Sequence, residues 1–93
     1  MKENIAVYPG SFDPITYGHL DIIRRALMIF DKVIVAVAQN YDKQSLFTPQ
    51  EKVEMIKEAV RDYPTVVVDT FKGLLMEYVR AAEAKVGIRG LRA

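Results

Sequence analysis

Residues 33–38 read Val-Ile-Val-Ala-Val-Ala, an unbroken apolar run that is rich in β-branched side chains. A strand with one face in water alternates apolar and polar residues, whereas a parallel strand that is covered on both faces is apolar throughout. The run therefore predicts a strand inside a parallel sheet. Parallel neighbours cannot be joined by a tight turn, so this strand also requires crossover connections, usually helices, elsewhere in the chain.

The rest of the chain supplies those connections. Between residues 19 and 30, apolar side chains recur at the spacing of one helix face. A second helix has a well-marked start, because Thr48 suits the N-cap, Pro49 the first helical position and Glu51 the third residue of a capping box. In full, we expect strands at 5–8, 32–38, 65–69 and 86–88, and helices at 19–30, from Pro49 to just before Pro64, and at 74–85.

This βαβαβαβ alternation predicts a single α/β domain of 93 residues, with a doubly wound parallel sheet in the order 3-2-1-4 and right-handed crossovers. In that order the strands at 5–8 and 86–88 lie side by side, where the direction of winding reverses. Ligands of such sheets bind beyond the carboxyl ends of the strands at this reversal. The segments that follow these two strands are therefore expected to meet in one crevice.

Charge and composition exclude several classes of function. Thirteen Lys and Arg residues against twelve Asp and Glu give a net charge of +1, so no overall attraction for nucleic acid exists and any phosphate site must be local. No apolar run approaches the roughly 20 residues of a membrane span, and residues 1–4 lead straight into the first strand without a visible signal peptide. There is no cysteine for disulfides or thiolate metal sites. We expect a cytoplasmic protein with no membrane or nucleic-acid partner.

The segment after the first strand has the features of a phosphate site. It reads Pro-Gly-Ser-Phe-Asp-Pro-Ile-Thr-Tyr-Gly-His over residues 9–19. A Gly/Pro turn exposes backbone N–H groups, and the start of the following helix adds about half a positive charge. The hydroxyls of Ser11 and Thr16 and the imidazole of His19 would lie nearby. The Gly-Lys-Ser/Thr of a P-loop and the G-x-G-x-x-G of a dehydrogenase are both absent from this sequence.

Two blocks of the sequence resemble a known family. Thr16-Tyr17-Gly18-His19 is similar to the (His/Thr)-x-Gly-His signature of the nucleotidyltransferase superfamily. The block Tyr8–Pro14 and the segment Ile88–Arg92 resemble the bacterial phosphopantetheine adenylyltransferase family, and the resemblance follows the whole chain in order. It implies a Rossmann-like fold whose C-terminal part, with further helices, a fifth strand and a serine-containing loop, is missing after Ala93. We therefore expect an exposed sheet edge and marginal stability for this piece alone.

The resemblance also implies a reaction, adenylyl transfer from ATP to 4′-phosphopantetheine, which gives dephospho-coenzyme A and pyrophosphate. A phosphomonoester has its second pKa near ~6, so the acceptor is largely a dianion at pH 7 and attacks the α-phosphorus without a general base. Catalysis then comes from positioning and fixed positive charge. We expect Mg²⁺ to be carried by the ATP phosphates, since the sequence offers no carboxylate cage. Coenzyme A as product or feedback ligand and a homohexamer are further implications.

By the same resemblance, the site residues divide into three groups. The catalytic group is His19, as transition-state stabiliser, with Lys43 and Arg92. ATP-binding residues are Gly10, Ser11, Phe12, His19, Gly90, Leu91 and Arg92. Acceptor-binding residues are Ser11, Lys43, Leu75 and Arg89.

Some assignments stay open. Leu75 is equally suited to the core. Asp13 could orient the turn, but neither it nor Thr16 is given a catalytic role. The helix N-terminus disfavours a second proton on His19, whereas a bound triphosphate would favour it, so both forms of the imidazole stay possible.

Two alternative functions also stay open. One is a sister nucleotidyltransferase with another acceptor, such as a cytidylyltransferase or a nicotinamide mononucleotide adenylyltransferase. Thr16 in the first signature position, with Lys43 and the segment Arg89–Arg92, favours the phosphopantetheine branch. The other alternative is a nucleotide-binding or assembly fragment without catalytic activity.

Overall fold

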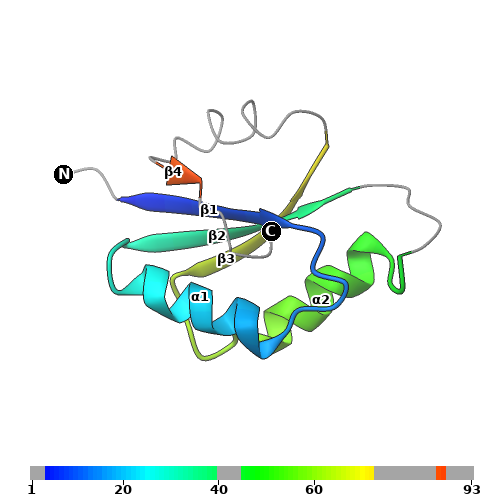
Figure 1. Cartoon of the computed structure of the whole chain (residues 1–93), viewed down its shortest axis with the longest axis horizontal. Coiled ribbons are helices and arrows are strands. Elements are labelled where there is room, and N and C mark those ends of the chain that lie inside the picture. Colours follow the sequence, from blue (N-terminus) through cyan, green and yellow to red (C-terminus); the bar gives the residue numbers. More distant parts are fainter. Residues whose placement is uncertain (1–3, 40–44, 73–85, 88–93) are drawn as a thin grey trace.

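The computed structural model describes residues 4–39, 45–72 and 86–87 (Figure 1). Its elements follow one another as β1 (Ile5–Gly10), α1 (Tyr17–Leu27), β2 (Lys32–Ala38), α2 (Pro49–Ala59), β3 (Val66–Phe71) and β4 (Val86–Gly87). The strands form one sheet in the order β3-β2-β1-β4, and each neighbouring pair is parallel. The predicted strand order is confirmed.

Several boundaries differ from the prediction. β1 runs two residues past Tyr8, because Pro9 and Gly10 still lie in register with Ala36 and Val37 of β2. β3 is shifted toward its carboxyl end and continues to Phe71, opposite Ala38. Both extensions bring the strand ends closer to the loops that follow them. The predicted helix at 74–85 lies outside the described residues, as does Ile88.

Both helices are shorter than the sequence pattern indicates. α1 begins at Tyr17 instead of His19 and ends at Leu27, although the Phe30 backbone N–H still donates to the Ala26 carbonyl at 2.8 Å. α2 ends at Ala59, well before Pro64. Apolar periodicity continued past both ends because Phe30 and Tyr63 still pack on the core after the helical backbone has stopped.

The start of α2 matches its prediction. The Thr48 hydroxyl accepts from the Glu51 backbone N–H at 3.1 Å, and the Glu51 carboxylate accepts from the Thr48 N–H at 2.9 Å. Pro49 occupies the first turn, as expected. This reciprocal pair satisfies two donors that a helix N-terminus otherwise leaves without partners.

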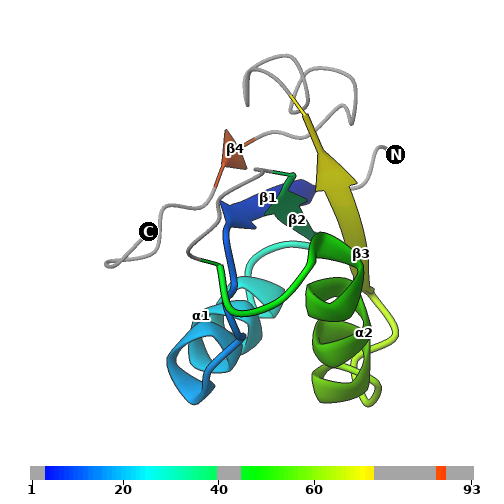
Figure 2. The ribbon, with the colours of Figure 1, turned by 90° about the vertical axis from the view of Figure 1, so that its right-hand side faces the viewer.

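α1 and α2 lie on the same face of the sheet (Figures 1 and 2). β2 lies between β1 and β3 in the sheet. Its side chains at 33, 35 and 37 belong to the core on the face that the helices cover, whereas Ile34 and Ala36 belong to a cluster on the opposite face. All five residues are at most 7% exposed. The unbroken apolar run thus reflects burial on both faces. Within the described ranges, no helix is long and apolar enough to cross a membrane.

The core between the two helices and the sheet stabilises this part of the fold. Ile56 of α2 has no exposed surface, whereas Ile29, just after α1, is 72% exposed. We predict that Ile56→Ala lowers the free energy of unfolding by about 2–5 kcal/mol, because it removes buried methyl groups and leaves a cavity. The matched Ile29→Ala should change it by less than about 0.5 kcal/mol. Urea unfolding followed by circular dichroism measures both, and equal losses would contradict this packing.

Candidate functional site

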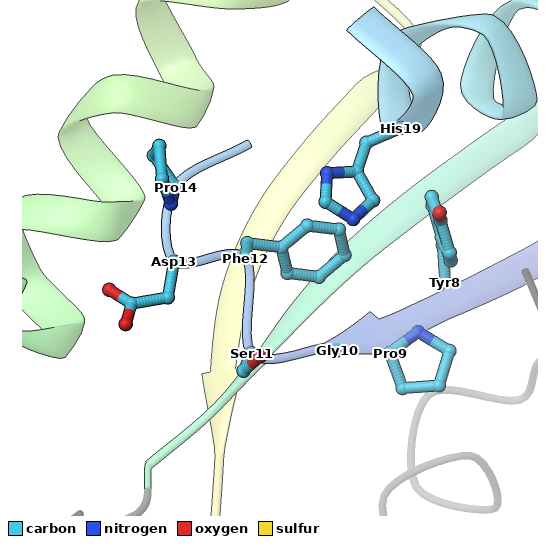
Figure 3. Close-up of a pocket in the computed structure, with 8 residues that line it drawn as sticks. All are labelled: Tyr8, Pro9, Gly10, Ser11, Phe12, Asp13, Pro14 and His19. Carbon is cyan, nitrogen blue, oxygen red and sulfur yellow. The ribbon is translucent and has the colours of Figure 1, made fainter. Parts of the chain in front are cut away.

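A cavity of about 230 Å³ lies at the carboxyl end of β1 (Figure 3). It is lined by Tyr8, Pro9, Gly10, Ser11, Phe12, Asp13, Pro14 and His19. All but His19 come from the end of β1 and the following loop, and His19 comes from the first turn of α1. Pockets for drug-sized ligands usually have ~300–1,000 Å³. The described residues therefore provide room for part of a nucleotide, such as its phosphates.

The loop closes on itself through Phe12. This residue has a positive φ of 44° and its ring is buried, with 2% exposed. A Cβ on Gly10 would lie 3.0 Å from Cε2 of that ring, which is tighter than nine in ten such contacts, so the ring would have to shift. Gly10 therefore lets the ring fold back over the end of β1. The family resemblance assigned Gly10 to ATP binding, and the structure shows that this glycine also makes room for the Phe12 ring.

Three rings meet at the cavity wall (Figure 3). The Phe12 ring makes edge contacts with Tyr8, at a centroid distance of 5.2 Å, and with the His19 imidazole, at 4.9 Å. Such contacts fix the imidazole between aromatic side chains. They also remove water from it, and this burial lowers the pKa of His19 below its usual value. Burial likewise raises the pKa of Tyr8.

The hydrogen bonds of His19 determine where its proton lies. The Thr16 backbone N–H donates to Nδ1 of His19 at 2.9 Å, and the His19 N–H donates to the Thr16 hydroxyl at 3.3 Å. This is a capping box in which histidine takes the place usually held by Glu or Gln. A nitrogen that accepts a hydrogen bond carries no proton, so the neutral imidazole has its proton on Nε2. His19 is therefore a neutral Nε2–H donor in the wall of the cavity.

Gly18 has no packing reason to be glycine. It is exposed, and a Cβ there would meet only the Thr16 hydroxyl oxygen, at an ordinary 3.6 Å. Glycine inside a helix costs about 1 kcal/mol relative to alanine. Contacts among the described residues do not explain a glycine at this position.

Asp13 connects the loop to a distant part of the chain. Its carboxylate accepts from the backbone N–H groups of Leu46 at 2.7 Å and Phe47 at 3.0 Å. Nζ of Lys52, a residue that is only 3% exposed, lies 4.0 Å from the same carboxylate. Sequence reasoning gave Asp13 only a possible role in orienting its own turn. No local signal could reveal these contacts, because the partners are more than 30 residues away.

The structure brings four of the predicted site residues together: Gly10, Ser11, Phe12 and His19. Ser11 is exposed, so its hydroxyl is accessible. The other predicted site residues lie outside the described residues: Lys43, Leu75, Arg89, Gly90, Leu91 and Arg92. Among the side chains that the structure describes, no group of three or more His, Asp or Glu residues could hold a metal ion.

In the strand order β3-β2-β1-β4, the direction of winding reverses between β1 and β4. The cavity loop and the N-terminus of α1 follow β1 at this point, which is the arrangement of a nucleotide-binding α/β domain. Comparison with known proteins gives the family. A model of the cytidylyltransferase-like family matches residues 7–93, and the chain belongs to this family.

Curated relatives resemble the whole chain. It is 60% identical to the phosphopantetheine adenylyltransferase of Syntrophotalea carbinolica and 63% identical to that of Geobacter sulfurreducens, each over 93 residues. The match covers 100% of this chain, but 56% and 57% of those two relatives. The chain thus spans little more than half the length of the curated relatives it matches.

Solved structures share the fold. A bifunctional NMN adenylyltransferase/ADP ribose pyrophosphatase from Francisella tularensis matches 88% of this chain and 26% of its own length, with a TM-score of 0.68 and 26% identity. A structure of a protein of the same description and organism, complexed with AMP and a manganese ion, matches 99% of this chain and 38% of its own, with a TM-score of 0.69 at 19% identity.

We predict that His19 titrates below pH 6.5, the usual value for histidine, because burial disfavours its charged form. Nuclear magnetic resonance of the ¹⁵N-labelled imidazole should also show the Nε2–H tautomer at pH 7.5. Below pH ~6.5 the unfolded chain binds more protons at this residue than the folded protein, so the free energy of unfolding falls as the pH is lowered. His19→Gln should remove this part of the pH dependence. A pKa at or above 6.5, or an Nδ1–H tautomer, would contradict the geometry.

Proposed function

We infer that this chain provides the β1–α1 phosphate site of an adenylyltransferase that joins ATP to 4′-phosphopantetheine, giving dephospho-coenzyme A and pyrophosphate. The observation that carries this inference is the neutral Nε2–H donor of His19, fixed at the helix start beside the cavity. The names of the curated relatives, at 60–63% identity, support the choice of acceptor.

The reaction needs positioning more than proton transfer. An oxygen of the dianionic acceptor phosphate attacks the α-phosphorus, and the bond from α-phosphorus to the bridging oxygen breaks, so that pyrophosphate leaves with the electron pair. Negative charge spreads over the α-phosphate oxygens as the new bond forms. The Nε2–H of His19 and the N-terminus of α1 would donate to these oxygens and stabilise them in the transition state. Asp13 is unsuited as a base, because its carboxylate already accepts two backbone hydrogen bonds.

A divalent cation would enter with the nucleotide. The described residues offer no cluster of three ligating side chains, and the Asp13 carboxylate accepts hydrogen bonds from Leu46 and Phe47 and lies 4.0 Å from Nζ of Lys52. This donor set fits Mg²⁺ that is held by the triphosphate and water, where it neutralises phosphate charge. No described carboxylate is then required as a metal ligand.

The remaining assignments are part of the same proposal. Lys43, Leu75 and Arg89 join Ser11 on the acceptor side, and Gly90–Arg92 contact ATP. Guanidinium groups suit this task because they bind phosphate oxygens in pairs. We also propose a cytoplasmic homohexamer with coenzyme A as product-side or feedback ligand, as the family resemblance implies.

A second candidate is adenylyl transfer to another acceptor. The chain is structurally similar, at 26% identity, to a bifunctional NMN adenylyltransferase/ADP ribose pyrophosphatase. Nicotinamide mononucleotide is therefore the alternative acceptor to test beside 4′-phosphopantetheine. Incubating the protein at its natural length with each nucleotide triphosphate and each acceptor, and measuring pyrophosphate release, separates the candidates. Release with ATP and 4′-phosphopantetheine supports the proposed reaction. Release with nicotinamide mononucleotide instead, or none with any pair, would overturn it.

Replacing His19 tests the catalytic step. We predict that His19→Ala lowers kcat by about 10²–10³-fold, the usual effect of losing one donor to transition-state charge, while the Kd of ATP rises less than about threefold. His19→Gln, which keeps a side-chain N–H donor, should recover part of the loss. Steady-state kinetics and equilibrium titration with ATP measure the two quantities. Equal losses in kcat and ATP affinity would contradict a role of His19 in the transition state.

Replacing Lys43 tests the acceptor side. We predict that Lys43→Ala raises the KM for 4′-phosphopantetheine by about tenfold and lowers kcat, because a charged contact to the phosphate is lost. Lys57→Ala is the matched control, since Lys57 lies exposed on α2 and is not one of the cavity-lining residues. An unchanged KM in Lys43→Ala would end this assignment.

A further inference from the structure

Both oxygens of the Asp13 carboxylate are engaged. Oδ2 accepts from the Leu46 backbone N–H at 2.7 Å, and Oδ1 accepts from the Phe47 backbone N–H at 3.0 Å. Asp13 itself lines the cavity, so these bonds join the cavity loop directly to the segment before α2. Hydrogen bonds to an ionised carboxylate are roughly twice as strong as those between neutral groups. The tether is therefore a substantial constraint on where residues 45–48 lie.

A buried cation reinforces the tether. Lys52 is only 3% exposed, and its Nζ lies 4.0 Å from Oδ1 of Asp13. An ammonium group that is removed from water needs a compensating charge nearby. Asp13 provides it, so the same carboxylate fixes the cavity loop, the start of α2 and a buried residue inside that helix.

We propose that Asp13 is a positioning residue for the acceptor side of the site. This inference rests on the proposed function. We give Asp13 no direct role in the chemistry, because both of its oxygens already accept hydrogen bonds from Leu46 and Phe47. It acts through the segment that these bonds hold. Lys43, the proposed acceptor-binding residue, lies outside the described residues but precedes Leu46 by only three positions in the sequence, so we expect a tether at Leu46 to limit its reach.

The two sides of the reaction respond differently. His19 is held by Thr16 and by the aromatic rings, and neither contact involves Asp13. Loss of the tether should therefore raise the KM for the acceptor more than the KM for ATP. A carboxylate that served folding alone would lower the amount of active protein and change neither KM.

The variants follow from the geometry. Asp13→Asn keeps the shape, but it places an NH₂ group against one of the two N–H donors and leaves Lys52 without a counter-charge. Asp13→Asn/Lys52→Met removes that unpaired charge and keeps a long apolar stem, so it tests the tether if the single variant folds poorly. The matched control is Asp31→Asn. Asp31 accepts from the Asn4 backbone N–H at 2.8 Å, but it is exposed and lies at the opposite end of β1.

Kinetics of the protein at its natural length give the first readout. In Asp13→Asn and in the double variant we expect the KM for 4′-phosphopantetheine to rise by about tenfold, the effect of losing one hydrogen bond to a charged group. The KM for ATP should stay within about twofold in both variants, and Asp31→Asn should leave both constants within about twofold of their original values. A lowered maximal rate with both KM values unchanged, or an equal rise in both, would overturn the positioning role.

Amide hydrogen exchange gives a second readout that does not depend on activity. In Asp13→Asn the protection of the Leu46 and Phe47 amides should fall by at least about tenfold, while the Val35 amide in the centre of β2 stays protected. Asp31→Asn should leave Leu46 and Phe47 unchanged. If the original protein shows no adenylyl transfer, the proposed function fails, and a loss of protection still supports the tether. If Leu46 and Phe47 keep their protection in Asp13→Asn, the tether is wrong whatever the activity.

Discussion

The hydrogen bond from the Thr16 backbone N–H to Nδ1 of His19 determines both where α1 begins and what the cavity can do. As part of a capping box it satisfies a backbone donor at the helix start, so it stabilises the helix. Because it occupies Nδ1, it also leaves the single ring proton on Nε2. A Glu or Gln could cap the helix equally well, but neither would place an imidazole N–H donor beside the cavity. One interaction thus serves folding and chemistry together.

The loop between β1 and α1 is fixed at three places, and each has a different physical basis. At its beginning, the absence of a side chain on Gly10 allows the buried Phe12 ring to fold back over the strand. In its middle, the Asp13 carboxylate bonds to the segment before α2. At its end, Thr16 and His19 cap α1. The proposed reaction brings two mutually repelling anions together, and such rigidity would assist it, because the protein then does not reorganise when charge develops.

The features that sequence predicted well are those encoded by neighbouring residues. The apolar run at 33–38 indicated a strand buried on both faces, and Thr48, Pro49 and Glu51 marked the start of α2. The strand order followed from the alternation of elements and the handedness of crossovers. Gly10, Ser11, Phe12 and His19 were expected to share a site, and the structure places all four around one cavity.

What the sequence did not reveal depends on tertiary contacts or on unusual chemistry at a familiar position. α1 was predicted to start at His19 because a histidine is not the usual partner in a capping box. The role of Asp13 could not be read locally, since Leu46 and Phe47 are brought to it only by folding. The sequence left the protonation of His19 open and gave no information on its tautomer, which follows from a hydrogen bond and not from residue type.

The most direct measurement of this account is a structure of the protein at its natural length with ATP bound. The account predicts an oxygen of the α-phosphate ~2.7–3.1 Å from Nε2 of His19, with Nδ1 still bonded to the Thr16 backbone N–H. A triphosphate bound on another surface, or an imidazole turned so that Nδ1 contacts the phosphate, would contradict it.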